Sequence, residues 1–162
     1  MELKVTPDRP NIVFLLSDDQ GWADYGFMGH PHIKTPHLDR LAGEGLLYER
    51  GYVTAPLCRP SLASLASGLY PHQTGIRGND PVMPTGKKPT RKNPGDKELW
   101  AKMRKRMMAP FAKQPSFIKQ LMANGYATLQ TGKWWEGNPL DHGFTDAMTH
   151  GDVSRGGRHG DE

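Results

Sequence analysis

The feature that most constrains this chain is an unbroken apolar run, residues 12–16, followed directly by Ser17 and the acidic pair Asp18 and Asp19. A short continuous run of branched and aromatic residues is typical of a strand buried on both faces, as in a parallel sheet. Looser apolar patterns predict a second strand over residues 46–53 and a third over residues 126–130. The chain is therefore expected to form a sheet whose strands are covered on both faces.

Helical patterns fall between these predicted strands. Thr35 followed by proline predicts a helix start, with an apolar face over residues 36–42. Further helices are predicted over residues 61–67, 97–108 and 117–122, the last of them capped by Ser116. Alternation of strands and helices predicts an α/β fold with a doubly wound, mostly parallel sheet.

Composition narrows the class of protein. The chain has 162 residues, 36% of them hydrophobic, and a net charge of +4, which is compatible with one folded domain and too mild to indicate nucleic-acid binding. Its single cysteine excludes an intrachain disulfide and a multi-thiolate zinc site. The longest apolar run is far shorter than the ~20 residues of a membrane span. Residues 1–10 are polar and lack a secretory signal, so we expect a periplasmic or secreted protein only with a longer N-terminus, and otherwise a cytoplasmic one.

Two segments differ from the rest of the chain. Residues 81–110 are rich in lysine, arginine and proline, which indicates either a solvated insertion with a short basic helix or a basic rim that steers an anionic substrate. Residues 149–162 are rich in glycine and charge and contain no closing element. We therefore expect a chain that is cut within its domain.

Candidate functional residues follow the three predicted strands. Asp18 and Asp19 follow the first, Cys58 lies beyond the second, and Lys133 follows the third. In open α/β sheets, ligands bind at the carboxyl ends of the strands. Adjacent carboxylates repel each other, and a calcium or magnesium ion bound by their oxygens relieves that repulsion. Cys58 precedes a predicted helix, whose N-terminus offers free N–H groups and a positive dipole end to an anion.

Each candidate also has an ordinary structural explanation. The acidic pair fits a helix cap or an Asx turn, Cys58 fits a small core residue, and Lys133 fits a surface lysine beside tryptophans. His72 and His142 are candidate acids or bases near neutral pH, or else hydrogen-bonded loop histidines. The residue types alone leave both interpretations open.

Five short motifs occur in order along the chain: Arg-Pro-Asn-Ile-Val-Phe-Leu-Leu-Ser-Asp-Asp-Gln-Gly-Trp at 9–22, Thr-Pro-His-Leu-Asp-Arg-Leu-Ala at 35–42, Pro-Leu-Cys-Arg-Pro-Ser through Ser-Gly-Leu-Tyr-Pro-His at 56–72, Gly-Tyr-Ala-Thr at 125–128, and Thr-Gly-Lys-Trp at 131–134. Together they resemble the N-terminal half of the sulfatase family. The resemblance implies the alkaline-phosphatase type of α/β fold and hydrolysis of sulfate esters or sulfamates. It identifies residues 1–162 as the N-terminal part of a single catalytic domain, truncated and inactive alone.

The resemblance also assigns roles to residues. Asp18, Asp19 and Cys58 match positions at the family's metal, calcium or alternatively magnesium, and Cys58 matches the position that a formylglycine-generating enzyme oxidises to formylglycine. In similar sulfatases, the hydrated aldehyde supplies a hydroxyl that attacks sulfur, and expulsion of sulfate later regenerates the aldehyde. Lys133 and the metal would stabilise charge on the transferred group. Three further candidates for substrate binding are Arg59, His72 and His142.

The chain departs from the family pattern at two positions. Leu62 stands where the modification motif Cys-x-Pro-x-Arg has arginine. Trp135 stands where the family's Gly-Lys-Trp-His turn has histidine. A later pair of metal ligands also has no counterpart before Glu162. Two alternatives stay open: a phosphate or phosphonate ester hydrolase of the same fold, and a non-catalytic protein that binds sulfated glycans. The expected partners are a sulfated small molecule or glycan and the modifying enzyme, without nucleic acid or a membrane span.

Overall fold

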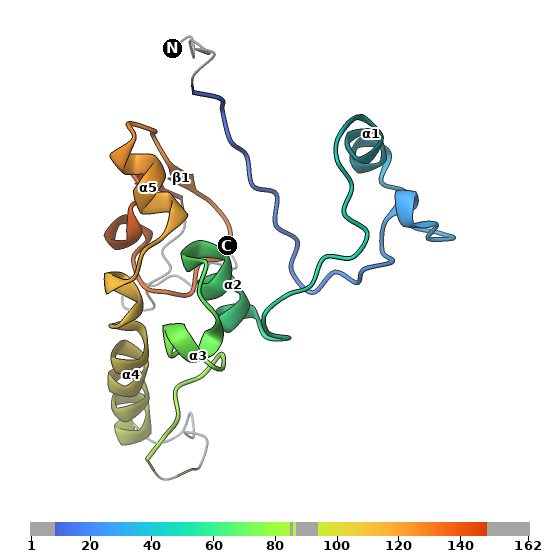
Figure 1. Ribbon diagram of the computed structural model, residues 1–162. Coiled ribbons are helices and arrows are strands. Elements are labelled where there is room, and N and C mark those ends of the chain that lie inside the picture. Colours follow the sequence, from blue (N-terminus) through green and yellow to red (C-terminus); the bar gives the residue numbers. More distant parts are fainter. Residues whose placement is uncertain (1–8, 85, 87–93, 149–162) are drawn as a thin grey trace. The chain divides into compact units, whose positions relative to one another are not determined.

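The computed structural model describes residues 9–84, 86 and 94–148 (Figure 1). The chain divides into two compact units, Met1–Gly51 and Tyr52–Glu162. The predicted tail 149–162 and part of the predicted insertion 81–110 lie outside the described residues. The elements in chain order are η1 (Gly26–Met28), α1 (Pro36–Glu44), α2 (Cys58–Ser67), α3 (Pro71–Thr74), α4 (Pro94–Met108), η2 (Phe111–Lys113), α5 (Phe117–Ala123), β1 (Leu129–Gln130), η3 (Pro139–His142) and β2 (Asp146–Ala147).

The first unit is built around η1 and α1. Helix α1 confirms the predicted start at Pro36, where the missing N–H of proline costs nothing. The Thr35 side chain does not cap the helix; it donates to Asp39 Oδ1 at 2.6 Å and accepts from the Gly26 backbone N–H at 2.7 Å. Asp39 Oδ1 also accepts from the Phe27 N–H at 2.9 Å, so these hydrogen bonds join α1 to η1.

The two strands predicted near this unit are absent from the described structure. Residues 12–16 form no strand, and their side chains are 49–79% exposed. Residues 46–53 also form no strand and are exposed. The interpretation of 12–16 as a strand buried on both faces is therefore wrong here. The physical reason is that a strand requires a neighbouring strand for its N–H and C=O groups, and the strand pairing of the described residues joins β1 to β2.

The second unit contains the hydrophobic core. Helix α5 matches the predicted helix at 117–122, and its cap is the predicted one, because the Ser116 hydroxyl accepts from the Lys119 N–H at 3.1 Å. Helix α2 ends at Ser67 and is followed by Gly68, whose φ of 73° suits a residue without a Cβ. The buried core residues come from α2, α5 and the intervening and following segments: Ala63, Ala66, Ile76, Phe111, Ile118 and Trp134.

The sheet of the described residues has two parallel strands. Leu129 pairs with Asp146, and Gln130 pairs with Ala147. Strand β1 confirms only the end of the third predicted strand, 126–130. The doubly wound sheet is thus represented here by one parallel pair with helices around it. The loop before β2 packs tightly on α5: a Cβ on Gly143 would lie 3.0 Å from the Lys119 backbone, at a φ of 99°.

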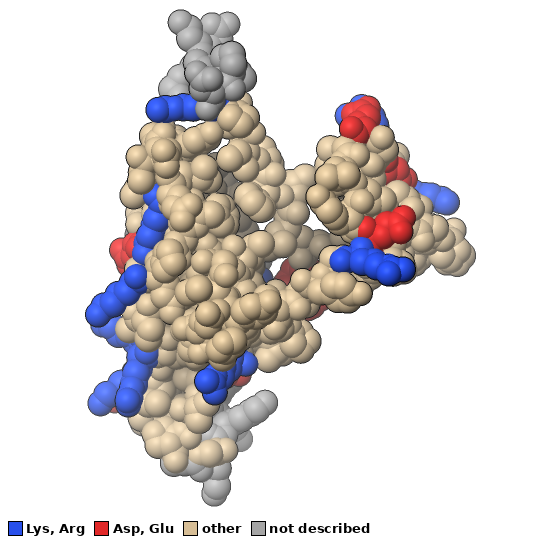
Figure 2. Space-filling view, in the orientation of Figure 1, with Lys and Arg blue, Asp and Glu red and all other residues tan. Residues whose placement is uncertain are grey.

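Helix α4 confirms the basic helix predicted at 97–108. Lysine and arginine side chains line its exposed side, as Figure 2 shows along the edge that α4 occupies in Figure 1. Arg104 differs from these, since it is 5% exposed and lies over the Trp100 ring at 5.3 Å. No helix within residues 9–84, 86 and 94–148 combines the length and apolarity needed to cross a membrane.

Candidate active site

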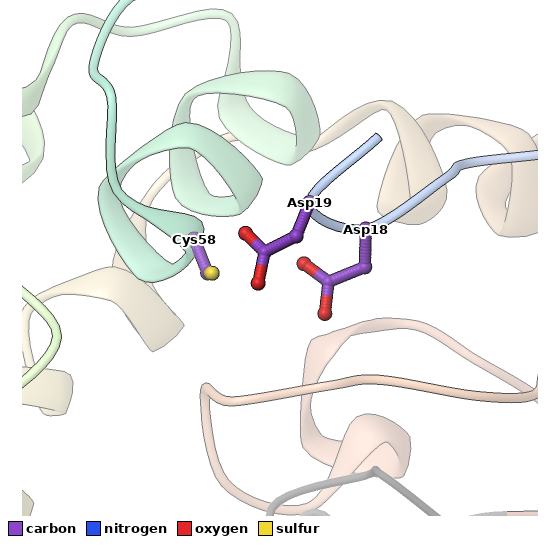
Figure 3. Close-up of side chains that lie close together, drawn as sticks. All are labelled: Asp18, Asp19 and Cys58. Atoms are coloured by element: carbon purple, nitrogen blue, oxygen red, sulfur yellow. The ribbon is translucent and has the colours of Figure 1, made fainter. Parts of the chain in front are cut away.

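Cys58 lies at the first turn of α2 (Figure 3). The helix begins at Cys58, three residues earlier than the predicted start, and Pro60 is accommodated because the first turn needs no N–H donor. The N-cap residue Leu57 has no capping side chain, and the Asn79 Oδ1 atom accepts from the Arg59 N–H at 3.0 Å instead. A distant side chain therefore fixes the backbone that presents the half-buried Cys58 thiol.

Lys133 meets Cys58 from the turn that follows β1. Its Nζ atom donates to Cys58 Sγ at 3.7 Å, across 75 residues of sequence. The preceding Gly132 has a φ of 78°, a conformation that glycine adopts at no steric cost. The Lys133 ammonium also lies 4.6 Å from the centre of the Trp135 ring, within the range of a cation–π contact. The structure thus brings together the two residues predicted to be catalytic.

A buried ion pair lies beside Cys58 and Lys133 in the sequence: Arg59 directly follows Cys58, and Glu136 comes three residues after Lys133. Arg59 and Glu136 form an ion pair with Nε and Oε1 3.3 Å apart, and their side chains are 2% and 1% exposed. The Arg59 guanidinium carbon also lies 5.2 Å from the centre of the Trp135 ring. Arg59, predicted to bind substrate, is therefore held inside the second unit by a carboxylate and an indole.

Burial dominates the electrostatics of this pair. Burial raises the pKa of Glu136 to about 7, while attraction to Arg59 and then Arg104 opposes the rise. Burial also lowers the pKa of Arg59, against the attraction of Glu136 and Asp80. Desolvation of a charged group acts in these directions for an acid and a base respectively. The proton equilibrium of Glu136 therefore lies near neutral pH.

The two candidate histidines occupy different environments. His142 is 4% exposed, and its ring lies 5.4 Å from that of Trp134 and 5.2 Å from that of Phe111. Burial lowers the pKa of His142, and a backbone hydrogen bond with Glu136 partly offsets this effect. His72 is exposed on α3 and stacks on Tyr70 at 5.9 Å. His142 is thus part of an aromatic cluster in the core, whereas His72 lies at the surface.

Asp18 and Asp19 belong to the first unit. Asp19 has a φ of 53°, a left-handed conformation that aspartate tolerates better than most residues. In an extended strand, neighbouring side chains point to opposite faces, but here both carboxylates project the same way (Figure 3). One oxygen of each carboxylate lies within 4.8 Å of the other. This pair of exposed oxygen donors suits a hard cation.

Sequence reasoning missed two residues that shape the second unit's part of the site. Asn79 is one of them, because its capping role depends on a contact 20 residues away. Glu136 is the other, and its only signal in the sequence is an acidic residue directly after the tryptophan pair that follows Lys133. The metal ligation predicted for Asp18, Asp19 and Cys58, and the substrate binding predicted for Arg59, His72 and His142, stay predictions.

Comparison with known proteins agrees with the resemblance to sulfatases seen in the sequence motifs. The family model described as Sulfatase matches residues 10–155. An N-acetylgalactosamine-6-sulfatase from Sus scrofa is 36% identical over 145 residues, which cover 86% of this chain and 25% of the relative.

Two further relatives are sulfatases named for other substrates. An ulvan-active sulfatase from Formosa agariphila is 41% identical over 85 residues, covering 52% of this chain and 17% of the relative. A steryl-sulfatase from Mus musculus is 32% identical over 149 residues, covering 85% and 21%. The chain spans about a quarter of the length of the N-acetylgalactosamine-6-sulfatases that it matches.

Proposed function

The chain belongs to the sulfatase family, and from that premise we propose that it supplies the nucleophile end of a site that hydrolyses sulfate esters. The single observation that carries the proposal is the contact of Lys133 Nζ with Cys58 Sγ at 3.7 Å, at the first turn of α2. Two motifs far apart in sequence meet there. The family implies an α/β fold of the alkaline-phosphatase type, in which this contact would lie at the reacting centre.

Cys58 and Lys133 have distinct proposed roles. Conversion of Cys58 to formylglycine by a modifying enzyme would supply an aldehyde whose hydrate is the nucleophile. Lys133 keeps an ammonium group at that position and would stabilise negative charge on the transferred group. The first turn of α2 directs its positive dipole end to the same place. The Trp135 ring lies 4.6 Å from the ammonium nitrogen, within the range of a cation–π contact.

Asp18 and Asp19 are the proposed metal ligands, with the Cys58 position as a third. The left-handed backbone at Asp19 and the short separation of the two carboxylates fit a hard cation. We propose calcium, with magnesium as the alternative. Such a cation supplies Lewis-acid stabilisation of anionic oxygen. The two aspartates would hold it by carboxylate oxygens alone, which disfavours softer metals.

The proposed substrate is a sulfated small molecule or a sulfated glycan. The names of the relatives refer to N-acetylgalactosamine 6-sulfate, ulvan and steryl sulfate, so the family accepts both glycans and small molecules. The exposed basic side of α4 favours an anionic ligand of either kind.

Release of inorganic sulfate from an aryl sulfate tests the proposal. Because residues 1–162 alone are expected to be inactive, the assay uses these residues within a complete sulfatase catalytic domain, co-expressed with a formylglycine-generating enzyme. Cys58→Ala should abolish turnover, because it removes the nucleophile. Lys133→Ala should lower kcat by about 10²–10³, the usual effect of removing one group that stabilises charge in the transition state. Lys34→Ala, which removes an exposed lysine of the first unit, should leave kcat unchanged. Turnover by Cys58→Ala at the wild-type rate would contradict the proposal.

A phosphate or phosphonate ester hydrolase is the second candidate. Leu62, on the half-buried side of α2, favours it, because the family's modification motif has arginine at that position. An unmodified thiol would then be the nucleophile. Release of phosphate from an aryl phosphate by protein with an intact Cys58 thiol, and no release of sulfate after modification, would favour this candidate.

A further inference from the structure

Two segments of the second unit are joined by a buried ion pair. One segment is the first turn of α2, which carries Cys58 and Arg59, and the other is the turn after β1, which carries Lys133 and Glu136. Arg59 Nε lies 3.3 Å from Glu136 Oε1, and neither side chain is more than 2% exposed. A second ion pair, Arg40 Nε with Glu44 Oε1 on α1, is 3.8 Å long, and its side chains are 72% and 70% exposed. Unlike the exposed Arg40–Glu44 pair, the Arg59–Glu136 pair therefore lies in the protein interior.

Trp135 connects this ion pair to the predicted catalytic residues. Its ring centre lies 5.2 Å from the Arg59 guanidinium carbon and 4.6 Å from the Lys133 ammonium nitrogen. The Lys133 ammonium in turn lies 3.7 Å from Cys58 Sγ. A chain of contacts therefore leads from Glu136 through Arg59, Trp135 and Lys133 to Cys58. It forms a closed ring, because Arg59 is covalently bonded to Cys58 in the backbone.

We propose that Arg59 and Glu136 are positioning residues, which hold Trp135 in place and thereby keep the Lys133 ammonium at the Cys58 position. The inference rests on the proposed function, since it gives the pair a role in the same site. It also assigns a role to Trp135, which stands where the family turn usually has histidine. Arg59 and Glu136 act through Trp135 and Lys133.

The physical need for such a device comes from the lysine side chain. A lysine ammonium is a point charge on four rotatable carbons, so one fixed position costs it substantial rotamer entropy. An aromatic ring restricts the ammonium only if the ring itself is held. The planar guanidinium of Arg59 suits stacking on an indole, and its ion pair with Glu136 restricts where the guanidinium lies.

A stabilising role alone explains the pair less well. Replacing a buried ion pair by apolar residues of similar volume is often neutral or stabilising, because desolvation of the two charges opposes their attraction. Arg104, buried on α4, adds a second positive charge that acts on Glu136. The buried charges are thus weak evidence for added stability, whereas the Arg59 guanidinium contacts both Glu136 and Trp135 of the turn that carries Lys133.

A thiol–amine cross-link tests the inference without any need for activity. The chain is produced without the modifying enzyme, so that Cys58 keeps its thiol, and is treated with a short reagent that joins a thiol to an amine. Peptide mass spectrometry then measures the yield of the Cys58–Lys133 link. Freeing two torsions with three staggered wells each dilutes one rotamer about ninefold. We expect the yield to fall by roughly five- to tenfold in variants that lack the pair.

Two variants separate positioning from stability. Glu136→Gln keeps the shape and removes the charge, and the double variant Arg59→Met with Glu136→Leu replaces the pair by apolar side chains that keep the fold. Both should lose the cross-link, and the double variant should do so while its thermal transition persists. Glu136→Asp, which retains the carboxylate, should keep at least half of the wild-type yield. Glu44→Gln, the same change in the exposed pair, is the matched control and should cross-link like wild type.

The outcomes distinguish the inference from the proposed function. Wild-type cross-link yields in the stable double variant would overturn the inference, whatever the activity. A lost cross-link in that variant supports it. In modified, active protein the same variant should lower kcat by about 10² with KM nearly unchanged, because Lys133 acts on charge that develops in the transition state. If a complete catalytic domain with wild-type residues 1–162 releases no sulfate while the cross-link responds as expected, only the proposed function is contradicted.

Discussion

The apolar run of the first unit of the chain is exposed, whereas the second unit has a buried apolar core. In the first unit, none of the described residues 9–51 is buried, and the apolar run 12–16 is exposed. In the second unit, Ile118, Trp134 and four other apolar residues form a core with almost no exposed surface. The difference shows that apolar composition does not by itself produce a buried element. Burial depends on neighbours that supply backbone partners and packing, and in this chain those neighbours surround α2 and α5.

The largest effect should come from matched truncations in the two units. Ile118→Ala removes a side chain that is 2% exposed and should destabilise the second unit by about 2–5 kcal/mol. Leu15→Ala removes a side chain that is 76% exposed and should change stability by less than about 0.5 kcal/mol. Chemical denaturation followed by tryptophan fluorescence measures both. Equal losses would break the comparison, because they would show that residues 12–16 are as well packed as α5.

The next effect concerns pH and the buried carboxyl group of the second unit. The pKa of Glu136 is raised from 4.5 to about 7 in the folded protein by burial. A raised folded pKa contributes stability below the unfolded pKa, and this contribution is lost as the pH rises through about 7. The free energy of unfolding of wild type, relative to Glu136→Gln, should therefore fall by up to about 3 kcal/mol between roughly pH 4.5 and pH 8.

The free energy of unfolding of Glu136→Gln must be subtracted at each pH, because His142 changes the stability with pH in the opposite direction. Its lowered pKa means that stability is lost as the pH falls below its ordinary value of 6.5. Glu44→Gln in the first unit removes one partner of an exposed ion pair and should change the free energy of unfolding by no more than about 0.5 kcal/mol. A difference between wild type and Glu136→Gln that does not change with pH would show that Glu136 is solvated.

The smallest of these effects is that of a helix cap. Ser116→Ala removes the hydroxyl that accepts from the Lys119 N–H and should cost the second unit ~1 kcal/mol. Ser17→Ala in the first unit removes a hydroxyl whose contact, with the Tyr25 hydroxyl, is exposed, and should leave the thermal transition in place. A larger loss for Ser17→Ala would mean that the first unit carries more of the stability than its exposed surface indicates.

The helix bounds that depend on neighbouring residues were predicted from the sequence. Helix α5 was expected within one residue of its observed bounds, because Ser116 and the Asn124–Gly125 stop act on the adjacent backbone. Helix α1 followed from Pro36 in the same way. The strands at 12–16 and 46–53 were wrong, because a strand forms only with a partner that its own residues do not specify.

The candidate site shows the same division. The motifs around Cys58 and Lys133 indicated two reactive residues, and the structure brings them together. The Arg59–Glu136 pair was not predicted, because each residue has an ordinary surface type and their contact depends on how the turn after β1 packs on α2. A buried pair of charges leaves no periodic pattern in sequence from which it could be inferred.

The central claim is that Cys58 is the reacting position of a sulfatase site, and mass spectrometry of the Cys58 peptide tests it most directly. The chain is co-expressed with a formylglycine-generating enzyme, in parallel with Leu62→Arg, which restores the arginine of the family motif. The account predicts an aldehyde in place of the thiol in the wild-type peptide, and a higher aldehyde fraction in Leu62→Arg. An intact thiol in both proteins would contradict it.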